Sequence, residues 1–133
     1  MRFMLLQNYG EVGSGSAPIT EWGPEDIKAH IEFQHTLNHE LSQSGELVDA
    51  LGLAGPDQAK FVVSDGVNPP VITDGPYPES KELLAGYRLI DVETVARAIE
   101  IAAKASAAPG PNGLPIRDPI EVRRVLSAPD PEV

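Results

Sequence analysis

Two kinds of hydrophobic periodicity divide the chain into predicted strands and helices. The apolar run Met1–Leu6 predicts a first strand, buried on both faces at the centre of a sheet. Residues 25–44 gather their apolar side chains on one broad face and stop at Gly45, so we expect a helix there. Apolar positions at helical spacing predict a second helix over residues 92–105.

Short stretches of β-branched or alternating apolar residues predict the remaining strands. Turn residues separate these stretches, which cover residues 46–53, 60–64, 70–73, 83–92 and 116–126. Asp65-Gly66 is a hairpin turn signal between two of them. Residues 11–24 are rich in Gly, Ser and Pro, and they predict a loop that is long for a compact domain.

The order of these elements predicts an α+β fold. A strand, a helix, several strands, a helix and a strand suggest a largely antiparallel sheet with both helices on one face. The predicted strands carry apolar residues on both faces of the sheet, and the helices cover only one face. We therefore expect a second copy of the chain to cover the other face. We expect one domain over residues 1–127 and a frayed tail over residues 128–133.

Composition narrows the classes of function. Twenty acidic and ten basic residues give a net charge of −10, which repels phosphate backbones, so we expect no nucleic-acid partner. The chain has no Cys, which excludes disulfides, thiol catalysis and Cys-based metal sites. No membrane span, signal peptide or cofactor-binding glycine motif is evident, so we expect a cytoplasmic protein that uses no cofactor and does not bind membranes.

Residues 71–82 read VITDGPYPESKE. This segment resembles the signature of the DGPF type of YCII-related proteins, a bacterial group, with Tyr77 in the place of Phe. The stretch LAGYRLIDV at residues 84–92 resembles their next strand, and the similarity extends over nearly the whole chain. The resemblance implies a ferredoxin-like fold whose two copies pair into a dimeric α+β barrel.

The resemblance also implies where a site lies. The wider YCII group is thought to carry a His and an Asp near a cleft between the first helix and the sheet. Counted back from Gly45, that His falls at or beside Gln34, whereas the histidines here are His30, His35 and His39. Asp49 and Asp57 are both candidates for the Asp of this pair. Some DGPF proteins are encoded with extracytoplasmic-function sigma factors or fused to them, which makes such a factor a candidate partner.

The helical spacing itself singles out His30. It lies at the centre of the apolar face with Gln34 one turn on, so both should point toward the sheet. Asp49 opposite could orient the imidazole ring as in general acid–base sites. The alternative is a core histidine whose ring is hydrogen-bonded to a backbone carbonyl.

Other residues are candidates for ligand binding. His35 and His39 could bind a divalent ion with an added acidic side chain, or form a solvated surface pair, so we expect no metal. Asp74 either organises its turn through backbone N–H groups or lines a cleft or the dimer interface. Lys81 either binds substrate or forms a salt bridge across the dimer, and the hydroxyl of Tyr87 needs a partner.

Two functions therefore remain open. The first is a non-catalytic dimeric module that binds a small molecule or regulates a partner. The lack of a complete catalytic motif favours this function. The second is a cofactor-independent isomerase or lyase that uses His30 and Asp49 as an acid–base pair on a small organic substrate.

Overall fold

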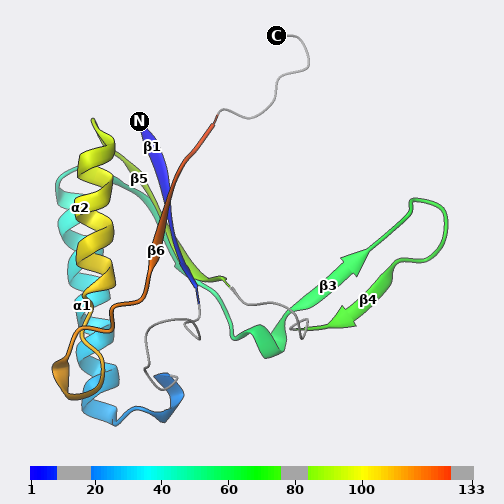
Figure 1. The fold of residues 1–133 in the computed structure, drawn as a ribbon, viewed down its shortest axis with the longest axis horizontal. Coiled ribbons are helices and arrows are strands. Elements are labelled where there is room, and N and C mark those ends of the chain that lie inside the picture. The colour runs from blue at the N-terminus through cyan, green and yellow to red at the C-terminus, as the bar shows by residue number, and fades with distance from the viewer. Residues whose placement is uncertain (9–18, 76–83, 127–133) are drawn as a thin grey trace.

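The structure is a computed structural model and describes residues 1–8, 19–75 and 84–126. Helices α1 (Pro24–Gln43) and α2 (Val95–Ser106) pack on one face of a four-stranded sheet (Figure 1). The sheet is antiparallel and has the order β2-β5-β1-β6, formed by β2 (Leu47–Gly52), β5 (Leu84–Asp91), β1 (Arg2–Asn8) and β6 (Ile120–Arg124). This is the ferredoxin-like arrangement, and it confirms the predicted α+β fold.

The first strand is central, as its apolar run predicts. β1 pairs with β5 on one side and with β6 on the other. Its side chains alternate between two faces. Phe3 and Leu5 are buried toward the helices, whereas Met4 and Leu6 lie on the opposite face and are half-buried.

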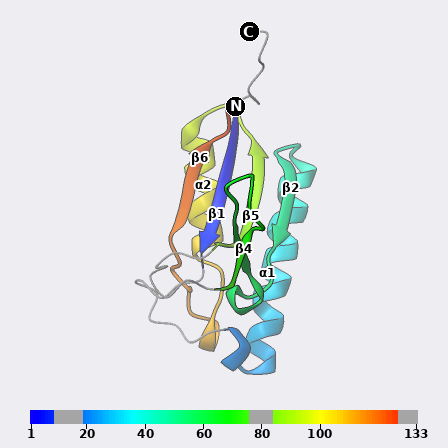
Figure 2. The ribbon, with the colours of Figure 1, turned by 90° about the vertical axis from the view of Figure 1, so that its right-hand side faces the viewer.

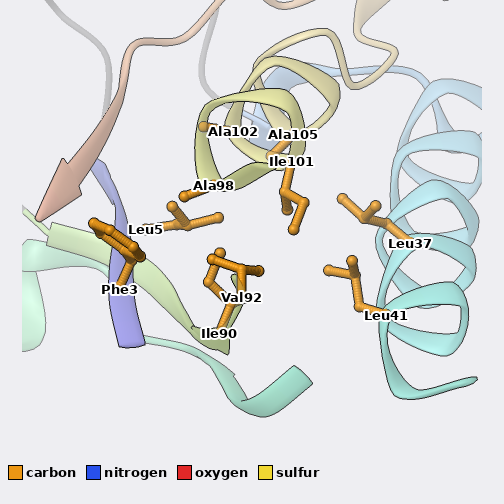
Figure 3. Packing of buried hydrophobic residues seen from close by; sticks show 10 residues of the cluster. All are labelled: Phe3, Leu5, Leu37, Leu41, Ile90, Val92, Ala98, Ile101, Ala102 and Ala105. Carbon is orange, nitrogen blue, oxygen red and sulfur yellow. The ribbon is translucent and has the colours of Figure 1, made fainter. Parts of the chain in front are cut away.

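The core fills the space between the helices and the sheet (Figure 3). The helix α2 contributes mostly small side chains, which allow it to lie close to the strands, and α1 contributes Leu37 and Leu41. The other buried members of this cluster are Phe3, Leu5, Ile90, Val92, Ala98, Ile101, Ala102 and Ala105. Ile90 and Ile101 have no exposed surface, so they mark the centre of the core.

The helices begin and end at the residues that their sequences favour. Pro24 occupies the first turn of α1, where a missing N–H costs no hydrogen bond. Gly45 follows α1 with a φ of 77°, and the next N–H, that of Glu46, donates to Leu41 O at 2.9 Å. This is a Schellman-type end. Thr94 caps α2 by accepting a hydrogen bond from the N–H of Arg97.

A separate hairpin projects from the open side of the sheet (Figures 1 and 2). The strands β3 (Lys60–Val63) and β4 (Val71–Asp74) pair only with each other and form a two-stranded sheet, which we call the arm (residues 60–74). The predicted turn is confirmed at its tip. Gly66 has a φ of 81°, and Asp65 Oδ1 accepts hydrogen bonds from the N–H groups of Val67 and Asn68.

Both faces of the arm carry exposed apolar side chains. They are between 59% and 89% exposed and comprise Val62, Val63, Val67, Val71 and Ile72. Among the described residues, no helix covers the sheet face from which the arm projects (Figure 2). The chain thus presents two apolar surfaces outside its own core.

Candidate functional site

A row of three polar side chains faces the sheet from α1. His30, Gln34 and Asn38 are spaced by four residues, so they lie on one side of the helix. Gln34 and Asn38 both accept hydrogen bonds from Arg88 of β5, with Arg88 Nε at 2.7 Å from Asn38 Oδ1 and Arg88 Nη2 close to Gln34 Oε1. We call these four residues the polar cluster.

The hydrogen bonds of the cluster fix the role of each atom. A guanidinium can only donate, so Gln34 must turn its oxygen toward Arg88 and its N–H₂ group toward His30. That group lies 3.4 Å from His30 Nε2, which therefore accepts. His30 Nδ1 lies 3.0 Å from the carbonyl oxygen of Pro109, to which it donates. The network thus selects the neutral imidazole with its proton on Nδ1.

The position of His30 is fixed from a second side by Trp22. The two rings meet edge to face, with their centroids 5.4 Å apart and their planes at 89°. The chain that supplies the Pro109 carbonyl is also held, because the N–H of Gly110 donates to Leu114 O at 2.7 Å. A Cβ atom on Gly110 would lie 2.9 Å from Ile116 Cγ1 and 3.6 Å from the Trp22 ring. Close packing therefore requires glycine there.

Arg88 is the unusual member of the cluster, because its charge is buried. It is only 8% exposed, and burial lowers its pKa from the ordinary value. In the part of the chain that the structure describes, no carboxylate forms an ion pair with Arg88. Burial of a single charge costs several kcal/mol, whereas each hydrogen bond to a charged group contributes about 1.5–3 kcal/mol. The hydrogen bonds to Asn38 and Gln34 offset this cost, but the two neutral amides bring no negative charge to the guanidinium.

The structure does not bring together the predicted acid–base pair, His30 and Asp49. Leu47 of β2 packs on the core side, and strict alternation would place Asp49 on the same side. A bulge intervenes, because Leu47 pairs with Ile90 and Asp49 pairs with the preceding residue, Leu89. The extra residue reverses the alternation and turns Asp49 to the face that lies away from α1.

Asp49 instead pairs with Tyr87. The Tyr87 hydroxyl donates to Asp49 Oδ2 at 3.2 Å, and burial together with this hydrogen bond raises the pKa of the phenol. Tyr87 and Arg88 are consecutive in β5, so their side chains leave opposite faces of the sheet. The predicted residues thus divide between two places, with His30 and Gln34 under α1 and Asp49 and Tyr87 on the open face.

The other candidates lie apart from both groups. His35 and His39 are exposed on α1, and no cluster of three or more metal-ligating side chains occurs among the described residues. Asp57 is exposed in a short 3-10 helix, Pro56–Gln58. Asp74 Oδ1 accepts a hydrogen bond from Lys60 Nζ at 2.7 Å, across the base of the arm. Lys81 lies outside the described residues.

Gly75, which follows the arm, occupies a crowded position. Its φ is not in the left-handed region, where Gly45, Gly66 and Gly113 lie. A Cβ atom there would lie 2.3 Å from Phe61 Cε2 and 3.3 Å from Ala59 Cβ. Space, rather than an unusual dihedral angle, requires glycine at this position.

Sequence reasoning missed two members of the cluster, Arg88 and Asn38. The signal for Arg88 is a charged residue within an apolar strand, two positions before the fully buried Ile90 and therefore on the same face. Asn38 continues the spacing of His30 and Gln34 by one further turn. Together these two signals indicate a polar contact between the first helix and the sheet.

Comparison with known proteins gives a family. The family model of the YCII-related domain matches residues 1–114 of the sequence. This range includes both helices, the arm and the whole polar cluster. Among curated proteins, none matches the chain. Neither described helix has the length and hydropathy that a membrane span requires.

Proposed function

Because the chain belongs to the YCII-related domain family, whose members are ferredoxin-like, we propose that it is a dimeric module that binds a small molecule at the polar cluster. The cluster supports binding better than acid–base catalysis. His30 already uses both ring nitrogens in hydrogen bonds within the chain, and Asp49 lies on the other face of the sheet. A ligand can be held by such a network without any proton transfer.

One observation carries this proposal: a buried cation with neutral partners lies between α1 and a sheet whose core is otherwise apolar. Polar groups at such positions are commonly hydrogen-bonded and fix the orientation of a ligand. His30, Gln34 and Asn38 are each only partly buried, so the cluster is not sealed inside the core. It combines specific hydrogen-bonding groups with access from outside.

Two apolar surfaces support the dimer. The open sheet face presents Met4, Leu6 and Leu89, and the arm presents valine and isoleucine on both of its sides. The arm points away from the open face of its own sheet (Figure 1), so the chain cannot bury one surface against the other. A second copy related by a two-fold axis can bury both at once. The dimer that we propose uses both surfaces.

The finer assignments remain predictions. The DGPF type depends on residues 71–82, of which residues 76–82 lie outside the described residues. A location in the bacterial cytoplasm, and a sigma factor as partner, are expected from the resemblance described above. Pull-down of the chain with and without a sigma factor from its own genome would test that partner.

A ligand screen tests the proposed binding function. A panel of neutral, cationic and anionic small molecules is titrated into the labelled protein while backbone amide resonances are recorded. We expect hits to shift the amides of residues 30–38 and 88 and to raise the unfolding temperature, because a ligand that binds only the folded state stabilises it.

His30→Ala and His39→Ala form a matched pair for this screen. Both histidines lie on α1, but only His30 belongs to the cluster, whereas His39 is exposed. We expect His30→Ala to weaken binding at least tenfold and His39→Ala to leave it unchanged. If every hit perturbs residues remote from the cluster, or if both variants bind alike, the proposed site is wrong.

A further inference from the structure

The guanidinium of Arg88 has donors to spare. Of its five N–H groups, one on Nε donates to Asn38 and one on Nη2 donates to Gln34. Among the described residues, the two N–H groups of Nη1 and the second of Nη2 have no acceptor. The acceptors that are present are uncharged amides, so the charge and part of the hydrogen-bonding capacity of Arg88 remain unmatched.

The geometry of the free donors suits a particular partner. Nε and Nη2 lie along one edge of the planar guanidinium, and the amides of Asn38 and Gln34 accept along that edge. The remaining donors belong to the pair Nη1 and Nη2 at the end of the side chain. Such a pair meets the two oxygens of one carboxylate through parallel, charge-assisted hydrogen bonds.

We propose that the polar cluster binds small organic molecules through a carboxylate group, which pairs with Nη1 and Nη2 of Arg88. This inference rests on the proposed function, because it names the chemical class of ligand for the same site. Gln34 and Asn38 hold the guanidinium in place through their hydrogen bonds, so the donors are oriented before the ligand arrives.

Charge balance favours a carboxylate over a phosphate group. Arg88 supplies one positive charge, and the network holds His30 as the neutral imidazole. A carboxylate brings one negative charge and neutralises the site. A phosphate monoester brings a charge of about −1.5 to −2, which would leave an unbalanced negative charge in a partly buried site of a chain whose net charge is −10.

The test uses pairs of molecules of matched shape. Acetate, propionate and benzoate are titrated alongside acetamide, propionamide and benzamide, at an ionic strength held constant with sodium chloride, and the Nε–H resonance of Arg88 is followed by NMR. We expect a saturable shift with the carboxylates, and at least tenfold weaker binding of the amides. Phenyl phosphate is expected to bind more weakly than benzoate.

Variants assign the effect to Arg88. Arg88→Met removes the charge, and Arg88→Lys keeps the charge but removes the planar pair of donors; we expect the first to abolish carboxylate binding and the second to weaken it at least tenfold. Arg124→Met, at an exposed position of β6, is the control that retains binding. If Arg88→Met does not fold, the resonance of Arg88 in the natural chain still decides the question.

The outcomes separate this inference from the proposed function. Amides that bind at the cluster as tightly as the carboxylates would leave the small-molecule site in place and overturn the carboxylate assignment. Tighter binding of phenyl phosphate would do the same. If the Arg88→Met variant binds carboxylates with unchanged affinity, the carboxylate does not pair with Arg88, and the carboxylate assignment is also overturned. If nothing in the broad screen perturbs the cluster, both the site and the inference fail.

Discussion

At the scale of single residues, His30 shows how a hydrogen-bond network determines the state of one ring. Its Nδ1 donates to Pro109 O, its Nε2 accepts from Gln34, and its ring edge meets Trp22. The sequence predicts that His30 points toward the sheet, and among the alternatives it offers is a histidine bonded to a backbone carbonyl. The structure shows that carbonyl contact.

Replacement of His30 by alanine is expected to destabilise the fold. The change removes two hydrogen bonds and the aromatic contact, and it leaves the Pro109 carbonyl without that donor, so we expect a loss of about 1–3 kcal/mol. Urea unfolding at pH 7 measures it. The matched change His39→Ala, at an exposed position, should alter stability by less than about 0.5 kcal/mol. Equal effects of the two changes would contradict the network.

Glu46 and Arg97 form the ion pair with the clearest dependence on pH. Arg97 donates from Nε and Nη2 to the two carboxylate oxygens at 2.8 and 2.9 Å. These bonds, with a further one from Ser44, lower the pKa of Glu46 from 4.5 to about 2. The pair ties the start of β2 to the first turn of α2.

Acid should therefore weaken the fold through Glu46. Because its pKa is lower in the folded chain than in the unfolded one, its contribution is fully present above pH 4.5 and is lost as the pH falls through about 2. We expect Glu46→Gln to cost about 1–2 kcal/mol at pH 7, and to show a smaller loss of stability between pH 5 and 2. Urea unfolding across this range checks both. Parallel pH profiles of the variant and the natural chain would refute the assignment.

Asp49 shows what residue patterns could not predict. Alternation along β2 places it near His30, but the bulge between Leu47 and Asp49 reverses the face. A bulge depends on how two strands pair, and β5 is more than thirty residues further along the chain. The sequence therefore identified His30 and Gln34 as side chains that face the sheet, but it did not predict which residue of the sheet they meet.

At the scale of elements, local signals fixed the helices well. The proline at the start of α1 and the glycine after its end each influence only the adjacent turn of the helix. The two ends of the helix can therefore be predicted without knowledge of the fold. The arm was harder to predict. Its strands look like members of the sheet, and only the tertiary arrangement shows that β3 and β4 pair with each other alone.

The pairing of β2 with β5 offers a sharp test at this scale. Gly52 and Gly86 are opposite each other in the register. A Cβ atom at Gly86 would lie 2.9 Å from Leu51 O and 3.2 Å from Gly52 Cα, whereas one at Gly52 would meet nothing within 4 Å. Neither glycine has a positive φ, so the two differ in space alone.

We expect Gly86→Ala to cost about 1–3 kcal/mol, because backbone atoms must move to admit the methyl group. Gly52→Ala should be neutral or slightly stabilising, since alanine restricts the unfolded chain more than glycine does. Thermal and urea unfolding compare the two variants. If the Gly86→Ala variant is as stable as the Gly52→Ala variant, β5 does not approach β2 as closely at Gly86 as the structure indicates.

At the scale of the whole molecule, the open sheet face and the arm are two apolar surfaces that lie outside the core. The polar cluster and the apolar open face lie on opposite sides of the same sheet, so association of two copies through the open face would leave the ligand site of each copy facing its own α1. Ligand binding and dimer formation are then separable properties of the chain.

The arm gives the means to test the dimer. Val62 and Ile72 are opposite each other in the register of β3 and β4, and they are 60% and 59% exposed. Removal of apolar contact area from both should weaken an interface that depends on the hydrophobic effect. We expect the double change Val62→Ser and Ile72→Ser to raise the dimer dissociation constant at least tenfold, measured by sedimentation equilibrium against a protomer mass of 14.2 kDa.

The control tests whether replacement of an exposed apolar residue outside the arm also weakens the dimer. Ile99 is 55% exposed on α2, within the helical layer on the far side of the sheet from the arm (Figure 1). Ile99→Ser should leave the dissociation constant unchanged, because the helices are not part of the proposed interface. A natural chain that sediments as a monomer at micromolar concentration, or a dimer weakened equally by both sets of changes, would contradict pairing through the arm.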